Sequence, residues 1–209
     1  KAKLRLLNAP HSTLAYLGVL VGVETVFDAM QQPALLQFLQ QLVDTEIKPS
    51  FQPPAELAVD SYSQDIFRRF QNPAVRHLLA QIAWDGSQKL PMRLLPIIQD
   101  NLAAGRPVAQ LALAVAAWCR FIRLRASQQP AQPLVDPLAS RLLAVAAQCS
   151  NDATTDVALF LAIDEVFPAK LALDRRFVAA LVQDYQQLDQ LHLSTLAQQL
   201  QLQPFGVSA

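Results

Sequence analysis

Three residues near the start of the chain have side chains suited to proton transfer and to binding an alcohol or carbonyl oxygen. Lys3, Asn8 and His11 lie in the otherwise apolar stretch "KLRLLNAPHSTLAYLG". On a continuous α-helix, His11 lies ~80° and Asn8 ~140° around the axis from Lys3, so the three share one half of the surface. A lysine desolvated among leucines has a lowered pKa and can act as a general acid or base. The amide can donate to a developing alkoxide, and the imidazole can bind a hydroxyl or carbonyl.

Pro10 complicates this helix because it has no N–H, and it predicts a break near Asn8. Asn8 is then a candidate N-cap for a helix that begins around Ala9 or Pro10. The alternative interpretation is purely structural: an exposed lysine, a helix cap and a hydrogen-bonded histidine. Spacing alone favours this structural interpretation.

A second polar cluster lies in "NPAVRHLLAQIAWDGSQKLPMRLL" and consists of Arg76, His77, Gln81, Asp85 and Lys89. His77, Gln81 and Asp85 repeat at i, i+4 and i+8, which predicts one polar line on a helix. The following "DGSQKLP" predicts a tight turn, with Gly86 left-handed and Pro91 at the start of the next helix. Lys89 is then held at a turn from which its ammonium group can point into a cleft.

Other interpretations of this stretch stay open. Asp85 or Ser87 can act as a helix cap with Lys89 as a solvated charge, which fits the spacing equally well. A serine–lysine hydrolase is disfavoured, because Ser87 and Lys89 diverge in a turn and nothing predicts an oxyanion hole. His11, His77 and His192 share no ligand spacing with each other or with cysteine, so no metal site is predicted.

The elements that must position these side chains are helical nearly throughout. The segment "PALLQFLQQLVDTEI" places one apolar stripe on a helix, formed by Leu35, Phe38, Leu39, Leu42 and Val43. The segment "VAQLALAVAAWCRFIRLR" is apolar almost all round, as expected of a helix at the centre of a core. Asp136, followed by Pro137, is a predicted N-cap, and so is Asp174. No run alternates with a period of two, so the predicted fold is all-α with one main core over residues 1–209.

The composition limits the classes of function. Of 209 residues, 52% are hydrophobic, and this apolar surplus predicts a surface covered by another domain or subunit. The 17 basic and 17 acidic residues cancel, which argues against a nucleic-acid partner. The longest apolar stretch, from about residue 14 to residue 23, is too short to span a bilayer, so no membrane association is predicted. No glycine-rich phosphate loop or βαβ alternation occurs, so no dinucleotide site of the usual kind is predicted.

Several further residues are expected to be structural. Cys119 and Cys149 lie in apolar helical runs and are predicted to be buried, inert thiols of a reduced, cytoplasmic protein. Trp84 and Trp118 are expected in the core. The C-terminal "HLSTLAQQLQLQPFGVSA" predicts a last short helix and a loose end.

Both polar stretches match one known family. "KLRLLNAPHSTLAYLG" resembles the K-x4-N-x2-H signature of the long-chain mannitol dehydrogenase family, which includes fructuronate and tagaturonate reductases. "RFQNPAVRHLLAQIAWDGSQKLPMRLL" resembles its second hallmark, a helix ending in D-G-S-x-K-x-P. "LALAVAAWCRFIR" and "DPLASRLL" follow in the expected order, so the resemblance covers essentially the whole chain.

The resemblance implies an all-helical C-terminal catalytic domain whose partner is an N-terminal Rossmann-like domain that binds NAD and is absent from this sequence. It implies that Lys3 is the general acid/base, that Asn8 stabilises partial negative charge on the reacting oxygen, and that His11 orients that oxygen. Lys89 matches a second lysine of the family, which contacts substrate. The isolated chain is expected to be inactive, because the hydride carrier has no site in it.

The resemblance also bears on the substrate. Some polyol-acting members carry arginine where this sequence has Gln81, and Gln81 with Arg76 and His77 looks more like the uronate reductases. A sugar acid's carboxylate would suit Arg76, His77 or Lys89. We therefore expect metal-independent interconversion of a ketose or fructuronate-like keto-uronate and its alcohol. A mannitol- or arabinitol-type polyol 2-dehydrogenase is one alternative, and a non-catalytic helical binding or scaffold domain is another.

Overall fold

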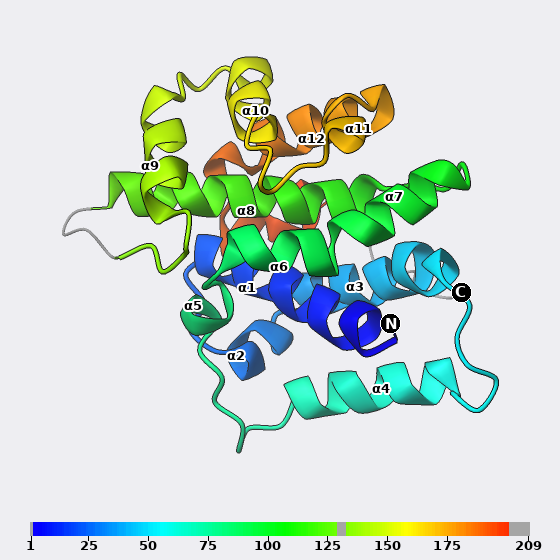
Figure 1. Cartoon of the computed structure of the whole chain (residues 1–209). Coiled ribbons are helices and arrows are strands. Elements are labelled where there is room, and N and C mark those ends of the chain that lie inside the picture. Colours follow the sequence, from blue (N-terminus) through cyan, green and yellow to red (C-terminus); the bar gives the residue numbers. More distant parts are fainter. Residues whose placement is uncertain (1, 129–132, 201–209) are drawn as a thin grey trace.

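Helix α8 is the centre of the fold. The computed structural model describes residues 2–128 and 133–200, and α8 spans Ala109–Ser127, with residues 111–122 all buried. In Figure 1 it crosses the molecule between two groups of helices, with α1 packed on one side and α12 on the other. A helix enclosed in this way has to be apolar all round, as its sequence predicts.

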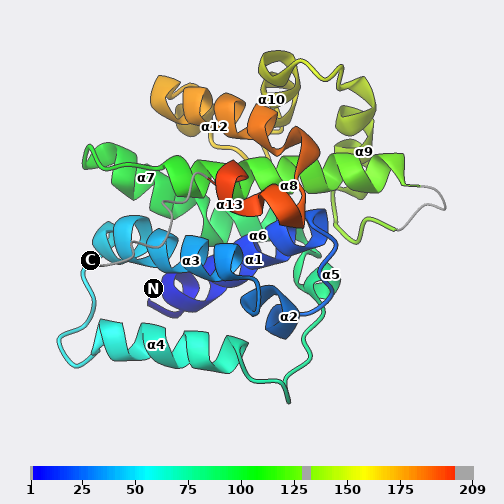
Figure 2. The same cartoon turned by 180° about the vertical axis from the view of Figure 1, so that it is seen from behind.

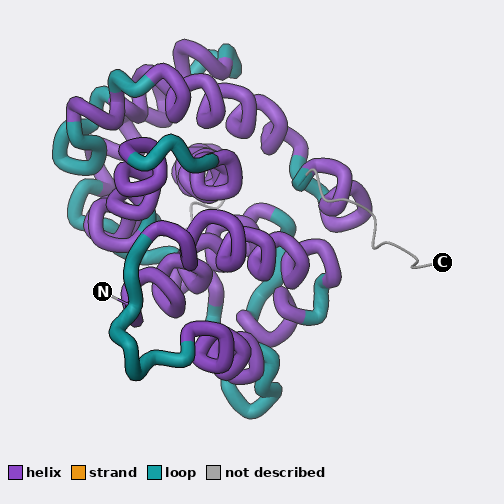
Figure 3. Tube along the Cα trace, turned by 90° about the vertical axis from the view of Figure 1, so that its right-hand side faces the viewer, coloured by secondary structure: helices purple, strands orange, loops and turns teal. Residues whose placement is uncertain are grey.

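The described residues form helices joined by loops, so the predicted all-α fold is confirmed (Figure 3). The helices that precede α8 are α1 (Ala9–Leu20), α2 (Val26–Met30), α3 (Pro33–Leu42), α4 (Val59–Phe70), α5 (Leu79–Ile82), α6 (Gly86–Arg93) and α7 (Leu95–Ala103). Those that follow are α9 (Ala139–Gln148), α10 (Ala153–Leu161), α11 (Ala169–Ala172), α12 (Arg175–Gln187) and α13 (Leu196–Gln199). Figure 2 shows α13 on the rear face, where it contacts α3.

Two local predictions are confirmed. The predicted apolar stripe is buried at each of its positions: Leu35, Phe38, Leu39 and Leu42 of α3, and Val43 directly after it. Asp174 caps α12, because its carboxylate accepts the backbone N–H groups of Arg176 and Phe177. Both features depend on residues within one or two helical turns of each other, which is why the sequence alone predicts them.

Two other predictions are wrong. The helix predicted to start at Pro137 begins at Ala139; the carboxylate of Asp136 accepts the N–H of Leu138 just before it, at 2.8 Å, but also binds Ser87 of α6. Trp118 is fully buried as predicted, but Trp84 is 41% exposed, because it lies in the surface turn between α5 and α6.

The remaining structural predictions concern the cysteines and the C-terminal end. Cys119 is buried, and burial raises the pKa of its thiol, whereas Cys149 is only half-buried. A short last helix, α13, is confirmed, and the predicted loose end after it lies outside the described residues. Within the described ranges, no helix is long and apolar enough to cross a membrane.

The start of α8 is held by a carboxylate from a distant part of the chain. Glu46 lies in the π-helical segment η2 (Val43–Ile47), and its carboxylate oxygens accept the N–H groups of Gln110 and Leu111, both at 2.9 Å. The first turn of a helix leaves these N–H groups unpaired, so Glu46 acts as a cap for α8.

Asp184 of α12 is also buried, and its Oδ2 has no hydrogen-bond partner among the described residues. Burial, followed by the charge of Glu46, raises the pKa of Asp184 to about 7.

Replacing Asp184 by Asn is expected to stabilise the chain above pH 7 and to change its stability little below pH 4. The folded pKa is about 7, whereas an unfolded Asp titrates near ~3.9. Between these values the folded state holds more protons, so the free energy of unfolding of the wild type falls as the pH rises, by at most about 4 kcal/mol. Urea unfolding at pH 5 and pH 8 measures this difference. Parallel pH profiles for wild type and variant would contradict it.

Candidate active site

Lys3, Asn8 and His11 lie along one continuous helical segment that is not a regular α-helix. Residues Leu4–Asn8 form a π-helical turn, η1, which runs directly into α1. The N–H of Ala9 donates to the carbonyl five residues earlier. A π-turn winds through fewer degrees per residue than an α-turn. Asn8 and His11 therefore come closer to the side of Lys3 than a regular α-helix would bring them.

Pro10 explains why the π-turn forms. In a regular α-helix the proline ring collides with the carbonyl four residues earlier, and no N–H is available to bind it. The wider turn just before Pro10 relieves this collision, so the helix continues. The predicted break near Asn8 is therefore wrong, and so is its predicted capping role: its backbone is helical and its side chain makes no capping hydrogen bond.

Arg5 anchors this segment to the rest of the molecule. It is 5% exposed, and its Nη1 donates to the carbonyl and hydroxyl oxygens of Ser50 at 2.8 and 2.6 Å. Its Nη2 pairs with Asp100 of α7. Lys3, two residues earlier, is exposed, and no hydrogen bond or ion pair joins it to another described residue. The desolvation expected for Lys3 would therefore have to come from outside the described residues.

His11 is held between aromatic rings. Its ring stacks on Phe70 of α4 with centroids 5.0 Å apart, and the ring of His77 lies 6.2 Å away. Burial, followed by the charges of His77, Arg93 and Lys89, lowers the pKa of His11 to about 4, so the imidazole is neutral at pH 7. Its Nε2 is buried and has no hydrogen-bond partner in the described part of the chain. A buried polar atom left in this state costs about 1–3 kcal/mol, and a ligand oxygen can remove that cost.

The predicted polar line of His77, Gln81 and Asp85 does not form. Residues 71–78 are turn and loop, and α5 is a single helical turn. The backbone at this point binds another segment instead: His77 accepts the N–H of Val26 at 3.0 Å, and the N–H of Leu79 donates to the carbonyl of residue 24 at 2.9 Å. These bonds compete with the helical pattern that the side-chain spacing suggests.

Gly86 serves close packing rather than a left-handed turn. A Cβ at this position would overlap the indole nitrogen of Trp118 and would crowd the hydroxyl of Tyr16. Asp85 takes the left-handed conformation, with φ 55°, and Pro91 lies inside α6. The predictions of a left-handed Gly86 and a helix start at Pro91 are therefore wrong. The absence of a side chain at Gly86 lets α6 lie directly on α8 and α1.

Lys89 lies half-buried on α6, and its Nζ donates to the carbonyl of Ile82 at 3.0 Å. Burial, followed by the charge of Arg93, lowers the pKa of Lys89, while Asp85 and Asp136 act in the opposite direction. Lys89 is also close enough to His11 to affect its pKa. The structure thus brings two of the predicted site residues together from α6 and α1.

Asp136 holds the start of α6. Its carboxylate accepts the N–H of Ser87 at 2.8 Å and the hydroxyl of Ser87 at 2.5 Å. The N–H of Asp85 donates to the carbonyl of Val135 at 2.9 Å. A carboxylate at a helix N-terminus satisfies unpaired N–H groups and interacts favourably with the helix dipole. The segment before α9 therefore caps the helix that carries Lys89.

Arg93 is a further candidate site residue, which the sequence analysis did not single out. It lies one turn after Lys89 in α6, and its Nη1 donates to the hydroxyl of Ser12, the neighbour of His11, at 2.9 Å. The i, i+4 spacing of Lys89 and Arg93 is visible in the sequence. Because the sequence predicts a helix start at Pro91, Lys89 falls in a turn and Arg93 in the next helix. In the structure both residues lie on α6.

Arg76 and Gln81 are exposed, and no hydrogen bond or ion pair joins them to the cluster within the described ranges. His77 is also exposed but reaches the cluster through its ring contact with His11. No group of three or more His, Cys, Asp or Glu side chains in the described part of the chain is arranged to hold a metal ion. The candidate site thus consists of the η1–α1 segment, with Lys3, Asn8 and His11, and the α6 residues Lys89 and Arg93.

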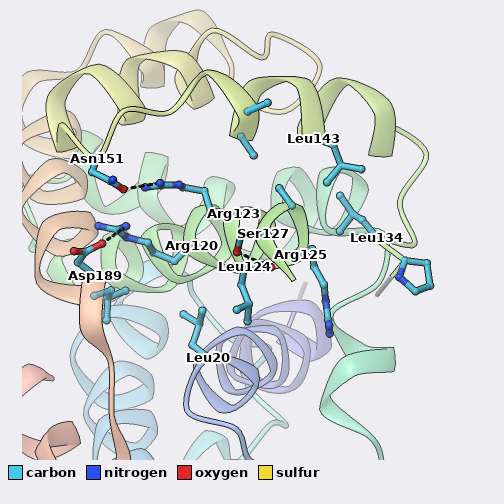
Figure 4. A pocket seen from close by; sticks show the side chains of 15 residues that line it. Leu20, Arg120, Arg123, Leu124, Arg125, Ser127, Leu134, Leu143, Asn151 and Asp189 are labelled. Carbon is cyan, nitrogen blue, oxygen red and sulfur yellow. Dashed lines mark hydrogen bonds and ion pairs between the residues drawn. The ribbon is translucent and has the colours of Figure 1, made fainter. Parts of the chain in front are cut away.

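A cavity of about 660 Å³ lies elsewhere, between the C-terminal part of α8 and α9. Figure 4 shows two of its arginines already bound, Arg120 to Asp189 and Arg123 to Asn151. Leu20, at the end of α1, lines this cavity, whereas the candidate site lies at the start of α1, about 14 Å away along the helix axis. The cavity is therefore not part of the candidate active site.

The fold and the site define an all-helical domain in which a lysine–asparagine–histidine helix lies beside a basic helix. The family model of the mannitol dehydrogenase C-terminal domain matches residues 1–189. The chain belongs to this family of oxidoreductase domains, which confirms the resemblance drawn from its two motifs.

Relatives and a solved structure support this membership. The chain is 38% identical to D-mannonate oxidoreductase of Escherichia coli (strain K12), over 89% of the chain and 38% of that protein. It is 33% identical to a mannitol 2-dehydrogenase of Phaeosphaeria nodorum, over 86% of the chain and 30% of that protein. Pseudomonas fluorescens mannitol 2-dehydrogenase, solved as a ternary complex with NAD and D-mannitol, matches with a TM-score of 0.86 and 28% identity, over 97% of the chain and 40% of that protein. The chain thus spans well under half the length of these relatives.

Replacing Asp136 by Ala is expected to lower the free energy of unfolding by about 1–3 kcal/mol, because it leaves the buried N–H and hydroxyl of Ser87 without an acceptor. Urea unfolding of the 209-residue chain measures the change. Asp164→Ala is the control, since the carboxylate of Asp164 is exposed and binds only at the surface; its loss is expected to be below about 1 kcal/mol. Equal losses in the two variants would contradict the capping role of Asp136.

Proposed function

We propose that this chain is the catalytic, substrate-binding domain of an NAD-dependent oxidoreductase that interconverts a ketose or keto-uronate and its alcohol. The observation that carries the proposal is the neutral His11, with an unpaired Nε2, beside the Lys89 and Arg93 of α6. Family membership supports the same reaction class. The name of the Escherichia coli relative, D-mannonate oxidoreductase, supports a sugar-acid substrate.

Lys3 acts in this proposal as the general acid/base. In the oxidation direction its neutral amine takes the proton of the substrate hydroxyl, and in the reduction direction its ammonium returns that proton. A lysine does this near pH 7 only when desolvation lowers its pKa. Lys3 is exposed in this chain, so the proposal requires another part of the protein to cover it.

Asn8 and His11 act on the reacting oxygen. The Asn8 amide donates to the partial negative charge that develops there, and the neutral imidazole of His11 orients the same oxygen through Nε2. These side chains supply the stabilisation that a metal ion gives in other dehydrogenases, so the proposed mechanism needs no metal. Lys89 binds the substrate further along its chain, with His77 at the edge of the site; Arg76 and Gln81 remain proposed substrate contacts at its exposed rim.

The cofactor is proposed to bind outside this chain. The described residues contain neither a parallel sheet nor a glycine-rich loop, so they offer no cradle for a dinucleotide. When bound, NAD supplies the hydride acceptor. The proposal places it in an N-terminal Rossmann-like domain, which the greater length of the relatives accommodates.

An exposed apolar rim fits such a partner domain. Leu4, Trp84, Met92 and Val135 are among the large hydrophobic side chains that the chain exposes, with Met92 61% accessible. Leu4 follows Lys3, and the other three lie on or beside α6, so they border the candidate site. A domain packed on this rim would bury it and would desolvate Lys3.

Two alternatives remain in the proposal. The mannitol 2-dehydrogenase relatives favour a polyol substrate such as mannitol or arabinitol. A non-catalytic helical binding or scaffold domain would keep the fold but would have no use for a lysine with a lowered pKa at position 3.

Replacing Lys3 by Met in the full-length enzyme is expected to lower kcat about 100-fold or more and to change substrate affinity little, because it removes the proton acceptor. NADH-coupled assays with fructuronate, tagaturonate and fructose measure the effect. Lys170→Met is the matched control, since Lys170 is an exposed lysine of α11 remote from the site.

Two outcomes would reject parts of the proposal. An unchanged kcat in the Lys3→Met enzyme would remove the proton-transfer role. A full-length protein without activity on any of these substrates, and with an ordinary pKa at Lys3, would favour the scaffold alternative.

A further inference from the structure

Arg93 is a half-buried cation at the centre of the candidate site. Its i, i+4 spacing from Lys89 places the two side chains on one face of α6, with Cβ atoms about 5–6 Å apart. Its Nη1 donates to the hydroxyl of Ser12, which is fully buried beside His11. The guanidinium is thereby held between α6 and α1, close enough to His11 to lower the pKa of that imidazole.

This guanidinium has no acidic partner in the described part of the chain. Three other buried or half-buried arginines do have one: Arg5 pairs with Asp100, Arg120 with Asp189, and Arg123 with Asp156. Half-buried Arg106 has two oxygen acceptors instead, the side chain of Asn101 and a backbone carbonyl. No ion pair joins Arg93 to a described carboxylate, and the hydroxyl of Ser12 accepts just one of its five N–H groups. A partly desolvated guanidinium without an anion is incompletely stabilised, and a ligand carboxylate can complete it.

The two carboxylates that act on Lys89, those of Asp85 and Asp136, do not serve as the acidic partner of Arg93. Asp136 is already used by the backbone and hydroxyl of Ser87 and by the N–H of Leu138. Asp85 lies at the opposite end of α6, about 12 Å from Arg93 along the helix axis. Neither Asp85 nor Asp136 therefore pairs with the guanidinium of Arg93.

We propose that Arg93, together with Lys89, binds the carboxylate of a sugar-acid substrate. The inference rests on the proposed function and deepens it, because it assigns the choice of substrate class to a residue. A guanidinium and a carboxylate form two parallel hydrogen bonds, which a hydroxyl cannot reproduce. A neutral sugar alcohol leaves the charge of Arg93 uncompensated, so the site selects against it. Arg76, one of the three carboxylate partners suggested by the sequence, is exposed and outside the cluster.

The test uses the full-length enzyme with D-mannonate and D-mannitol, which differ in that a carboxylate replaces one terminal CH2OH group. Arg93→Met keeps most of the aliphatic stem and removes the charge. Its kcat/KM for D-mannonate is expected to fall about 10- to 100-fold, mainly through KM, because charge-assisted hydrogen bonds are lost. The ratio of its kcat/KM for D-mannonate to its kcat/KM for D-mannitol is expected to fall about tenfold or more relative to wild type. Arg93→Lys keeps the charge without the fork and should lie between wild type and Arg93→Met.

Two control variants separate binding from structure. Arg175→Met removes an exposed arginine of α12 far from the site and should change neither substrate. Ser12→Ala removes the protein partner of Arg93 and tests whether that hydrogen bond by itself supports the fold. Equal losses for D-mannonate and D-mannitol in Arg93→Met would overturn the inference, since a purely structural role affects both.

Calorimetric titration with D-mannonate separates this inference from the proposed function. Binding by the wild type that is lost in Arg93→Met supports the inference even if neither substrate is turned over, in which case the proposed function fails. A wild-type enzyme that oxidises D-mannitol but does not bind D-mannonate overturns the inference and leaves the oxidoreductase function intact. A protein that binds neither compound overturns both.

Discussion

The contact between Gly86 and the side chain of Trp118 is the constraint on which the arrangement of the site depends. Trp118 is fully buried at the centre of α8, and Tyr16 of α1 reaches the same point. Only a residue without a Cβ lets the start of α6 come this close. Because the start of α6 packs against both helices here, Lys89 lies half-buried and near His11 of α1.

The π-helical turn η1 places Lys3, Asn8 and His11 on one side of a single helical segment. The π-turn before Pro10 keeps one helix running from Lys3 to His11, and Arg5 fixes that helix to Ser50 and Asp100. The exposed Lys3 on this anchored helix is compatible with the proposal that a second domain completes the site. The chain spans well under half the length of the relatives it matches.

Carboxylates from distant segments stabilise the helix starts that matter. Glu46 caps α8 and Asp136 caps α6, although neither lies next in sequence to the helix it serves. In each case an anion satisfies N–H groups that a helix cannot pair by itself. These caps place the two helices relative to the rest of the fold, which local capping by an adjacent residue cannot do.

The sequence by itself determined the helical class, the buried stripe of α3 and the cap of α12, because these follow from periodicity and spacing within a few turns. It singled out Lys3, His11 and Lys89 only through their resemblance to a family motif, and the structure brings His11 and Lys89 near each other. Where a backbone or side-chain group has both a local and a distant hydrogen-bond partner available, only the tertiary structure decided which partner it binds. Pairing with residues 24–26 interrupts the helix expected around His77. Asp136 accepts the N–H of Leu138 before its own helix but also binds a serine 49 positions away. The position of Arg93 likewise depends on tertiary contacts, because these set where α6 begins and which helices it packs against. Hydrogen bonds and contacts between residues far apart in the chain set these features, and no local pattern encodes them.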